Sequence, residues 1–263
     1  MEKKTMVTKK VAKTEENKSK ETRIADAVQF RTEMKFLLPE MQLQRIESKV
    51  RLICFRDPHT DENARYEIRS LYFDSLDDIC YRECKSGADN RKKYRIRIYN
   101  GSDERINLEC KMGLHGKKRK ETVLLTKEEY DMIRENRFPE DGFLDEEILG
   151  LRGEFTERLQ SGYLPKVVVG YQRTAYVYPA GNVRITFDRD ITVLPPNALF
   201  DKSIGGIPVL FPGKAVLEIK YDDVLPGAIR NIMAAEDNLR PTSFSKYALC
   251  RDALKGETVG WFE

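Results

Sequence analysis

The sequence lacks several features that would assign a chain to a common class at once. No apolar run approaches the roughly 20 residues that a membrane-spanning helix needs, and no hydrophobic segment follows the basic N-terminus as in a secretory signal. Histidine occurs only twice, and the five cysteines are odd in number and scattered. A zinc cluster is therefore not expected. We expect a cytoplasmic protein with free thiols and no transmembrane segment.

A strong excess of one charge is also missing. The 46 lysines and arginines nearly balance the 43 acidic residues, which leaves a net charge of +3. A nucleic-acid-binding domain usually carries a much stronger basic field, so any site for a polyanion must come from local arrangement of charge. The chain is 263 residues long and 40% hydrophobic, which suits one large domain or two small ones with a substantial core.

Two regions differ in composition. Residues 1–27 are rich in Lys, Glu and Thr without apolar periodicity, so we expect a disordered tail, either simply solvated or in peripheral contact with an anionic membrane. Residues 28–263 are expected to form the folded domain. Strands are predicted at 30–38, 64–75, 91–100, 105–113, 122–126, 166–178, 183–193 and twice within 207–223. Helices are predicted at 39–55, 76–87, 127–136, 141–160, 226–238 and 245–255, with a basic loop at 114–121.

These elements indicate an antiparallel α+β protein, and the charge pattern of its strands favours a closed barrel. In the stretch "RKKYRIRIYN", Lys93, Arg95 and Arg97 alternate with apolar residues, so the cations share one face of the strand. Six predicted strands carry polar or charged residues two apart in this way. One such strand is usually a solvated sheet face. Six together indicate a polar interior, because every strand of a barrel turns one face inward.

The expected lumen is rich in cations. They would repel one another in an enclosed space unless an anion were present, and arginine in particular suits the paired oxygens of a phosphate group. The cations on these faces, with a neighbouring cluster, are Lys35, Lys93, Arg95, Arg97, Lys111, Lys118 to Lys120, Arg173 and Arg184.

A few carboxylates accompany the cations, namely Glu33, Glu109, Asp188 and Glu218. Each is a candidate ligand for a hard divalent cation that bridges phosphate groups. Other roles remain open at this stage. Glu33 and Glu109 can equally form ion pairs, and Asp188 can hold an arginine in place. Many cations with a few acids indicate a site for a chain of phosphates together with a metal ion.

Seven short motifs resemble one family. In chain order they are "EMK", "KYRIRIY", "LECKMG", "GYQRTAY", "VRITFD", "LEIKYD" and "SFSKYAL". They are similar to the catalytic domain of the vacuolar transporter chaperone (VTC), a polyphosphate polymerase among the triphosphate tunnel metalloenzymes, which also include the CYTH group. The similarity extends over about residues 28–255. Each motif alone is weak evidence, but seven in order are a strong signal.

The resemblance implies an eight-stranded antiparallel barrel, surrounded by helices, that binds ATP, inorganic polyphosphate and Mn²⁺ or Mg²⁺. The reaction it implies moves the γ-phosphoryl group of ATP to a growing polyphosphate chain. The residues that match the family's phosphate-binding lysines and arginines are Lys35, Arg95, Arg97, Lys111, Arg173 and Arg184, with Lys118 or Lys120 as a further tunnel lysine. Tyr171, Ser245 and Lys246 match further phosphate contacts, and Glu218 matches the metal-binding glutamate.

Two departures from the family pattern affect the prediction. The CYTH hydrolases begin with E-x-E-x-K, whereas this chain has "RTEMK" with Arg31 at the first acidic position, which favours a polymerase over a triphosphatase. Eukaryotic polymerases of this kind also carry a regulatory domain and transmembrane helices, for which this sequence has no room, so a stand-alone form is expected. A metal-dependent tripolyphosphatase or nucleoside triphosphatase and a non-catalytic polyphosphate-binding module remain alternatives. A nucleic-acid-binding function is disfavoured, because aliphatic rather than aromatic residues alternate with the cations.

Overall fold

The computed structural model describes residues 31–57, 65–114, 117–135, 137 and 150–256. The predicted tail, and the part of the predicted helix 141–160 that precedes residue 150, lie outside these residues. None of the helices in the described residues combines the length and the apolar character needed to cross a bilayer.

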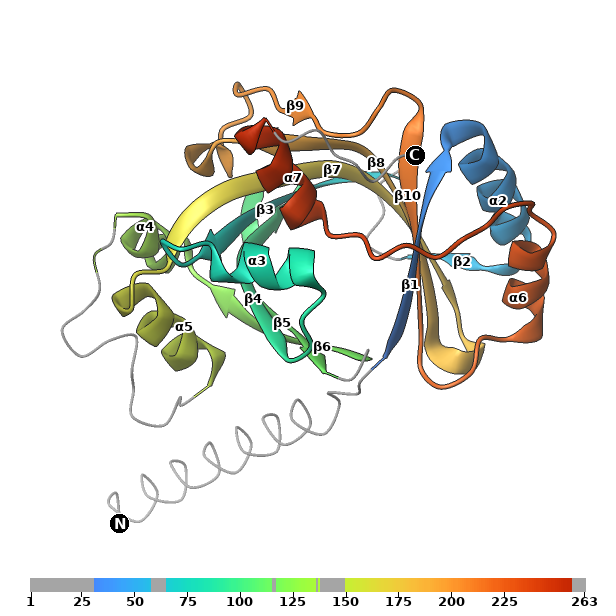
Figure 1. The fold of residues 1–263 in the computed structure, drawn as a ribbon, viewed down its shortest axis with the longest axis horizontal. Coiled ribbons are helices and arrows are strands. Elements are labelled where there is room, and N and C mark those ends of the chain that lie inside the picture. The colour runs from blue at the N-terminus through green and yellow to red at the C-terminus, as the bar shows by residue number, and fades with distance from the viewer. Residues whose placement is uncertain (1–30, 58–64, 115–116, 136, 138–149, 257–263) are drawn as a thin grey trace, which may run out of the picture. The chain divides into compact units, whose positions relative to one another are not determined.

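Eight strands form one curled antiparallel sheet (Figure 1). They are β1 (Thr32–Pro39), β3 (Tyr66–Asp74), β4 (Arg91–Tyr99), β5 (Ser102–Leu114), β6 (Lys117–Leu125), β7 (Leu164–Tyr178), β8 (Val183–Leu194) and β10 (Lys214–Tyr221). Their order in the sheet is β1-β10-β8-β7-β3-β4-β5-β6. The short strands β2 (Phe55–Arg56) and β9 (Ile207–Pro208) pair with β7 and β8.

The curl of the sheet brings its two edge strands together. Arg31, directly before β1, and Lys118 in β6 exchange two backbone hydrogen bonds, with N···O distances of 3.1 and 3.2 Å. In the described part of the chain, this bridge is the hydrogen-bonded contact between the two edges. The predicted antiparallel α+β architecture is therefore confirmed, with the barrel joined along β1 and β6 at one point.

Six helices complete the described part of the fold. They are α2 (Glu40–Ile53), α3 (Ile79–Ser86), α4 (Lys127–Arg134), α5 (Leu151–Gln160), α6 (Gly227–Ala234) and α7 (Lys246–Lys255). The helix α2 begins directly after Pro39, and its residues Leu43, Ile46 and Val50 follow the helical period and are fully buried. They form one apolar cluster with residues of α6 and with outward-facing residues of β1, β8 and β10, such as Phe36 and Ile219. The apolar strand faces thus pack against helices, and the polar faces turn inward.

Some of the predicted boundaries of the elements need correction. The run predicted as a basic loop, residues 114–121, is largely strand, because Lys117–Leu125 pairs with β5 as β6. Its charged residues lack the apolar alternation by which a strand is recognised. The helix predicted at 226–238 ends at Ala234, and the helix predicted at 76–87 begins at Ile79 as α3. The helix α4 is capped by Thr126, whose Oγ1 accepts a hydrogen bond from the Glu129 backbone N–H at 3.1 Å.

Candidate functional site: a cationic lumen

Strand register places the predicted site residues on the inner face of the sheet. Residues directly opposite each other on antiparallel strands share a face. Lys35 lies opposite Glu218, and Glu218 lies opposite Thr186 on the next strand. Across the sheet, Arg95 of β4 lies opposite Glu109 of β5. Lys93 of β4 lies opposite Lys111 of β5, which in turn lies opposite Lys120 of β6, so these residues share the same face. The remaining predicted strand residues on this face are Glu33, Arg97, Lys118, Tyr171, Arg173, Arg184 and Asp188.

The other two predicted residues come from α7. Ser245 is the N-cap of this helix, and its Oγ accepts a hydrogen bond from the Ala248 backbone N–H at 3.4 Å. Lys246, the next residue, extends its ammonium group to Asp188 at 2.7 Å and lies 5.1 Å from the centre of the Tyr171 ring. The first turn of α7 therefore adds a cation to those of the strands.

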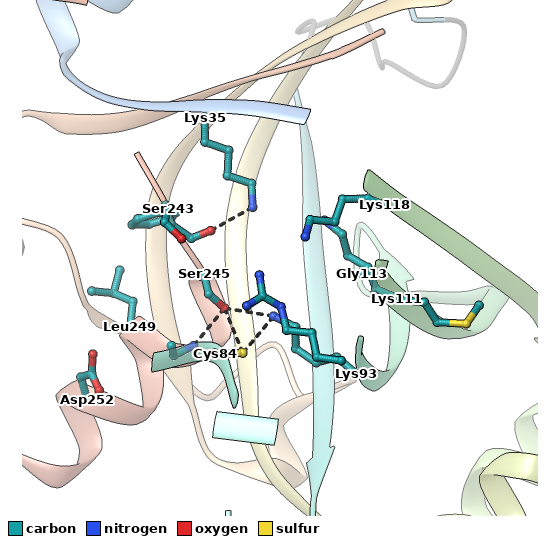
Figure 2. A pocket seen from close by; sticks show the side chains of 14 residues that line it. Lys35, Cys84, Lys93, Lys111, Gly113, Lys118, Ser243, Ser245, Leu249 and Asp252 are labelled. Carbon is teal, nitrogen blue, oxygen red and sulfur yellow. Dashed lines mark hydrogen bonds between the residues drawn. The ribbon is translucent and has the colours of Figure 1, made fainter. Parts of the chain in front are cut away.

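In the part of the chain that the structure describes, three cavities lie along this inner face. A central cavity of about 580 Å³ is lined by Arg95, Arg97, Arg173, Glu218 and Lys246 among others. A second, of about 690 Å³, is here called the lysine mouth and is lined by Lys35, Arg91, Lys93, Lys111 and Lys118 beside Ser243 and Ser245. Figure 2 shows the side chains of Lys35, Lys93 and Lys118 converging on it from different strands. The third, of about 1190 Å³, is here called the tyrosine mouth and is lined by Tyr66, Tyr99, Arg105, Lys120 and Arg184 beside Asn100, Ser102 and Glu104.

Glu109 organises the cations of β4. Its side chain is fully buried and lies 2.6 Å from an Arg95 guanidinium nitrogen and 2.7 Å from Lys120 Nζ. Arg97 is farther away, at 3.6 Å. Burial alone would raise the pKa of Glu109, but Arg97, Arg95 and Lys120 outweigh it and hold the pKa well below its ordinary value. Glu109 therefore stays charged and holds the Arg95 side chain in one orientation.

Asp188 holds the cations of β7 and α7 in the same way, namely Arg173 and Lys246. Both of its oxygens accept hydrogen bonds from Arg173, at 2.6 and 2.7 Å, and one also contacts Lys246. Burial raises the pKa of Asp188, whereas Arg173 and Lys246 lower it, with a net shift below the ordinary value. The bidentate arrangement fixes the plane of the Arg173 guanidinium. Glu109 and Asp188, both candidate metal ligands from sequence, are thus each occupied by two or more cations.

Glu33 and Glu218 differ from these two carboxylates in having lysines rather than arginines as ion-pair partners. They lie on neighbouring strands, where Glu33 contacts Lys35 at 2.8 Å and Lys111 at 2.7 Å, and Glu218 contacts Lys220 at 2.6 Å. Burial raises the pKa of Glu33, and the charge of Glu218 acts in the same direction, but the two lysines outweigh both and lower it. Burial likewise raises the pKa of Glu218, and Lys220 and Lys35 bring it well below its ordinary value.

This carboxylate pair fits a divalent cation that is held jointly with phosphate. Mg²⁺ is usually bound through one or two carboxylates plus substrate phosphate oxygens, rather than by a complete set of protein ligands. Among the described residues no group of three or more His, Cys, Asp or Glu side chains could hold a metal ion. Glu33 and Glu218 are two carboxylates that repel each other in the lumen, and they match a site where one or two carboxylates share the ion with phosphate oxygens. Glu33 and Glu218 are therefore the residues that fit such an ion.

Several lysines of the lumen lack enough negative charge around them. Burial lowers the pKa of Lys111 well below its ordinary value, and the neighbouring Lys35 and Lys220 act in the same direction against Glu33. The pKa values of Lys118 and Lys120 are also lowered, by burial first. Such shifts mean that bringing a further anion into the lumen would be favourable.

Neutral side chains that hold the arginines were not predicted. The Tyr72 hydroxyl accepts a hydrogen bond from Arg95 Nη1 at 2.7 Å, and the Ser70 hydroxyl accepts one from Arg97 Nε at 3.1 Å. Tyr171, which was predicted, accepts one from Arg97 Nη2 at 3.2 Å. Burial raises the pKa of the Tyr171 phenol, but Arg173 and Arg97 outweigh it and lower the pKa. Tyr72 and Ser70 carry no charge, so only the register of β3 against β4 identifies them.

The structure also shows which residues contact Lys93 and Arg184, which the sequence alone did not indicate. Lys93 Nζ lies 3.0 Å from Cys84 Sγ and 3.4 Å from Ser245 Oγ, which joins β4 to α3 and α7 (Figure 2). Arg184 pairs with Asp57 at 2.7 Å and donates a hydrogen bond to the Tyr66 hydroxyl at 3.2 Å. Arg184 therefore belongs to the tyrosine mouth.

Arg31, which replaces an acidic residue of the CYTH pattern, forms a salt bridge with Asp222 at 3.1 Å. The lumen therefore gains no carboxylate from this position of the strand. On the inner face near this end, β1 and β10 contribute the carboxylates of Glu33 and Glu218.

An antiparallel sheet curled around a cationic lumen with buried carboxylates is the architecture that the resemblance to the triphosphate tunnel proteins implies. The model of the VTC domain matches residues 30–255, and the chain belongs to this family. The membership supports a polyphosphate-related enzyme that transfers phosphoryl groups.

Solved structures with a similar fold come from several organisms. One is a candidate adenylate cyclase from Bacillus halodurans, with 14% identity, 78% of this chain and 87% of that chain covered, and a TM-score of 0.45. Another, from Vibrio parahaemolyticus, has 13% identity, coverage of 79% and 86%, and a TM-score of 0.44. A Pyrococcus horikoshii protein has 14% identity, coverage of 83% and 98%, and a TM-score of 0.46. A comparison with curated protein sequences finds no match.

Proposed function

We propose that this protein transfers the γ-phosphoryl group of ATP to the end of an inorganic polyphosphate chain and releases ADP. The observation that carries the proposal is the surplus of inward-facing cations over carboxylates in a lumen built from eight strands. Phosphate chains offer closely spaced negative charge along their whole length, which is the complement of this lining. The family membership supports the same substrate class.

The arginines of the central cavity would hold the reacting phosphates. Arg95, Arg97 and Arg173 each have a fixed orientation, set by Glu109, by Ser70 and Tyr171, and by Asp188 respectively. Phosphoryl transfer passes through a loose transition state whose charge is spread over the phosphate oxygens, so catalysis depends on position and charge neutralisation. Guanidinium groups held in this way lose little freedom when the substrate binds.

Glu33 and Glu218 would hold Mn²⁺ or Mg²⁺, whose positive charge would help to neutralise the phosphate oxygens. Lys35, Lys111 and Lys220 now share these two carboxylates. The acceptor end of a polyphosphate chain is already anionic, so the proposed reaction needs no strong general base. The absence of a third carboxylate at Arg31 is consistent with transfer to phosphate rather than to water.

The test is to incubate the purified protein with ATP and Mn²⁺, resolve the products on a gel stained for polyphosphate, and assay free phosphate in parallel. The proposal predicts long chains with ADP. Free phosphate without chains would assign the protein to the tripolyphosphatases or nucleoside triphosphatases. Tight polyphosphate binding with neither product would leave a binding module.

The lumen assignment is tested by Arg95→Ala, which should abolish turnover while the protein remains folded, since Glu109 keeps Arg97 and Lys120 as partners. Lys92→Ala is the matched control, because Lys92 lies next to Lys93 on the opposite face of β4 and pairs with Glu154 at 2.6 Å. The control should keep full activity. Activity of Arg95→Ala within about threefold of the wild type would contradict the assignment, since lost transition-state charge stabilisation costs far more.

A further inference from the structure

A buried carboxylate at the end of β3 takes no part in the lining of the three cavities. Asp74 is fully buried, and its oxygens accept hydrogen bonds from the backbone N–H groups of Ser75, Cys80 and Tyr81 at 2.8, 2.8 and 2.9 Å. Cys80 and Tyr81 lie in the first turn of α3, where a carboxylate is favourable. A further hydrogen bond comes from the Tyr247 hydroxyl at 2.7 Å. Asp74 therefore joins β3 and α3 to the first turn of α7.

Tyr247 is held on more than one side. Its side chain is buried, and its hydroxyl donates to Asp74 while it accepts a hydrogen bond from Arg251 Nη1 at 3.1 Å. Arg251 also pairs with Asp78, directly before α3, at 2.7 Å. Burial raises the pKa of Tyr247, and the charge of Asp74 acts in the same direction, so the hydroxyl keeps its proton and remains a donor.

The ring of Tyr247 lies against a residue that contacts the lumen. It stacks on the Tyr72 ring, with 5.0 Å between the ring centres and 22° between the planes. The Tyr72 hydroxyl accepts a hydrogen bond from Arg95 Nη1 at 2.7 Å, whereas Glu109 contacts Nε and Nη2 at 2.7 and 2.6 Å. Glu109 thus holds one side of the guanidinium and Tyr72 holds the other. Each terminal nitrogen keeps a second N–H for a phosphate oxygen.

We propose that Tyr247 is a positioning residue for Arg95: its hydrogen bond to Asp74 fixes the ring on which Tyr72 stacks, and Tyr72 in turn fixes the guanidinium plane. The inference rests on the proposed function, in which Arg95 neutralises charge on the reacting phosphates. Tyr247 acts through Tyr72 and does not touch the substrate. A guanidinium that is already oriented loses little freedom when the transition state forms, so a looser hold on Arg95 lowers kcat.

The first test compares the steady-state kinetics of the wild type and Tyr247→Phe with ATP and Mn²⁺. The variant keeps the ring and removes the hydroxyl. Its kcat should fall by about 10- to 100-fold while KM for ATP stays within about threefold, because a misplaced group that acts in the transition state affects kcat first. Tyr81→Phe is the matched control, since it also removes a buried hydroxyl that bonds to a carboxylate, that of Asp252 in α7, at 2.5 Å. Its kcat should stay within about twofold of the wild type.

A second pair of measurements separates positioning from a general loss of structure. Tyr72→Phe removes the hydroxyl that Arg95 contacts, and combining it with Tyr247→Phe should cost no more than the more harmful single change, because both act through Arg95. NMR spectra of protein with isotope-labelled arginine follow the Arg95 guanidinium without turnover, and Arg95→Lys identifies its signal. Rotation about the Nε–Cζ bond should be faster in Tyr247→Phe and unchanged in Tyr81→Phe.

The contrary results are distinct. Losses that multiply in the double variant would mean that Tyr247 acts independently of Tyr72, which would overturn the proposal. A kcat of Tyr247→Phe within about twofold of the wild type, a rise in KM alone, or an equal loss in Tyr81→Phe would do the same. A wild type that makes no polyphosphate would overturn the proposed function, whereas the NMR comparison would still decide whether Tyr247 orients Arg95.

Discussion

Replacing Glu109 by glutamine should make the ligand-free protein less stable. The same substitution should increase the stabilisation that a bound phosphate chain provides. The substitution keeps the size of the side chain but removes the negative charge that Arg95 and Lys120 contact at 2.6 and 2.7 Å. Glu109 is fully buried, so the cations lose their partner in a place that water does not reach easily. Breaking a buried ion pair in this way costs about 3–5 kcal/mol.

The cost can be read as a change in melting temperature. For a domain of this size, each kcal/mol shifts the melting temperature by about 2–4 °C, so Glu109→Gln should melt roughly 6–20 °C below the wild type. Tripolyphosphate should restore part of this loss, because its oxygens would replace the missing carboxylate as partners of Arg95 and Lys120. The shift caused by the ligand should therefore be larger in the variant than in the wild type.

Thermal unfolding followed by circular dichroism, with and without tripolyphosphate, measures both quantities. Glu121→Gln is the matched control, since Glu121 pairs with Arg119 at 2.7 Å on the outer face of β6, where both side chains are partly exposed. Such a pair contributes about 0–1 kcal/mol. If Glu109→Gln melted within about 2 °C of the wild type, less than 1 kcal/mol would separate them, and Glu109 would not be the counter-charge of the lumen.

Two predictions concern pH. Glu109 and Asp188 have lowered pKa values in the folded protein, so their stabilisation is present above their unfolded pKa values of about 4 and should be lost as pH falls from there through the folded values. A melting temperature that stays level in this acid range would refute this, and Glu109→Gln should show a shallower decline. Lys118 has a lowered pKa and should lose its charge at a lower pH than an ordinary lysine, so polyphosphate affinity should fall on the alkaline side before about pH 10.4. Lys118→Arg should show a shallower decline, because the arginine stays charged while Lys111 and Lys120 still lose their charge; identical alkaline profiles would show that Lys118 does not contact the ligand.

The inner face of the sheet could be predicted because charge marks it. In β4 the alternation of Lys93, Arg95 and Arg97 with apolar residues assigns both faces from sequence alone. On the apolar side, Ile96 and Ile98 are fully buried in a cluster that includes residues of α4 and α5. A local period of two is thus enough to orient a strand whose two faces differ strongly in polarity.

Other parts of the site depend on contacts between distant segments. Lys118 and Lys120 belong to a strand without apolar alternation, so their positions follow only from pairing with β5. Asp57 was not predicted to hold Arg184, because the two residues are far apart in the sequence and Asp57 follows the very short strand β2. The roles of Glu109 and Asp188 also stayed open, since a carboxylate that binds metal and one that binds arginine look alike in sequence.

The junction between β1 and β6 has a consequence for solubility. Strand edges with free backbone groups can pair with another molecule, and proteins commonly prevent this with charged side chains, lysine above all. The strand β6 begins with Lys117, Lys118, Arg119 and Lys120, beside the bridge to Arg31. The same basic run that lines the lumen would also repel the corresponding edge of a second molecule. Neutralising the whole run would therefore favour self-association as well as weaken phosphate binding, and any such variant should be checked by light scattering before its activity is interpreted.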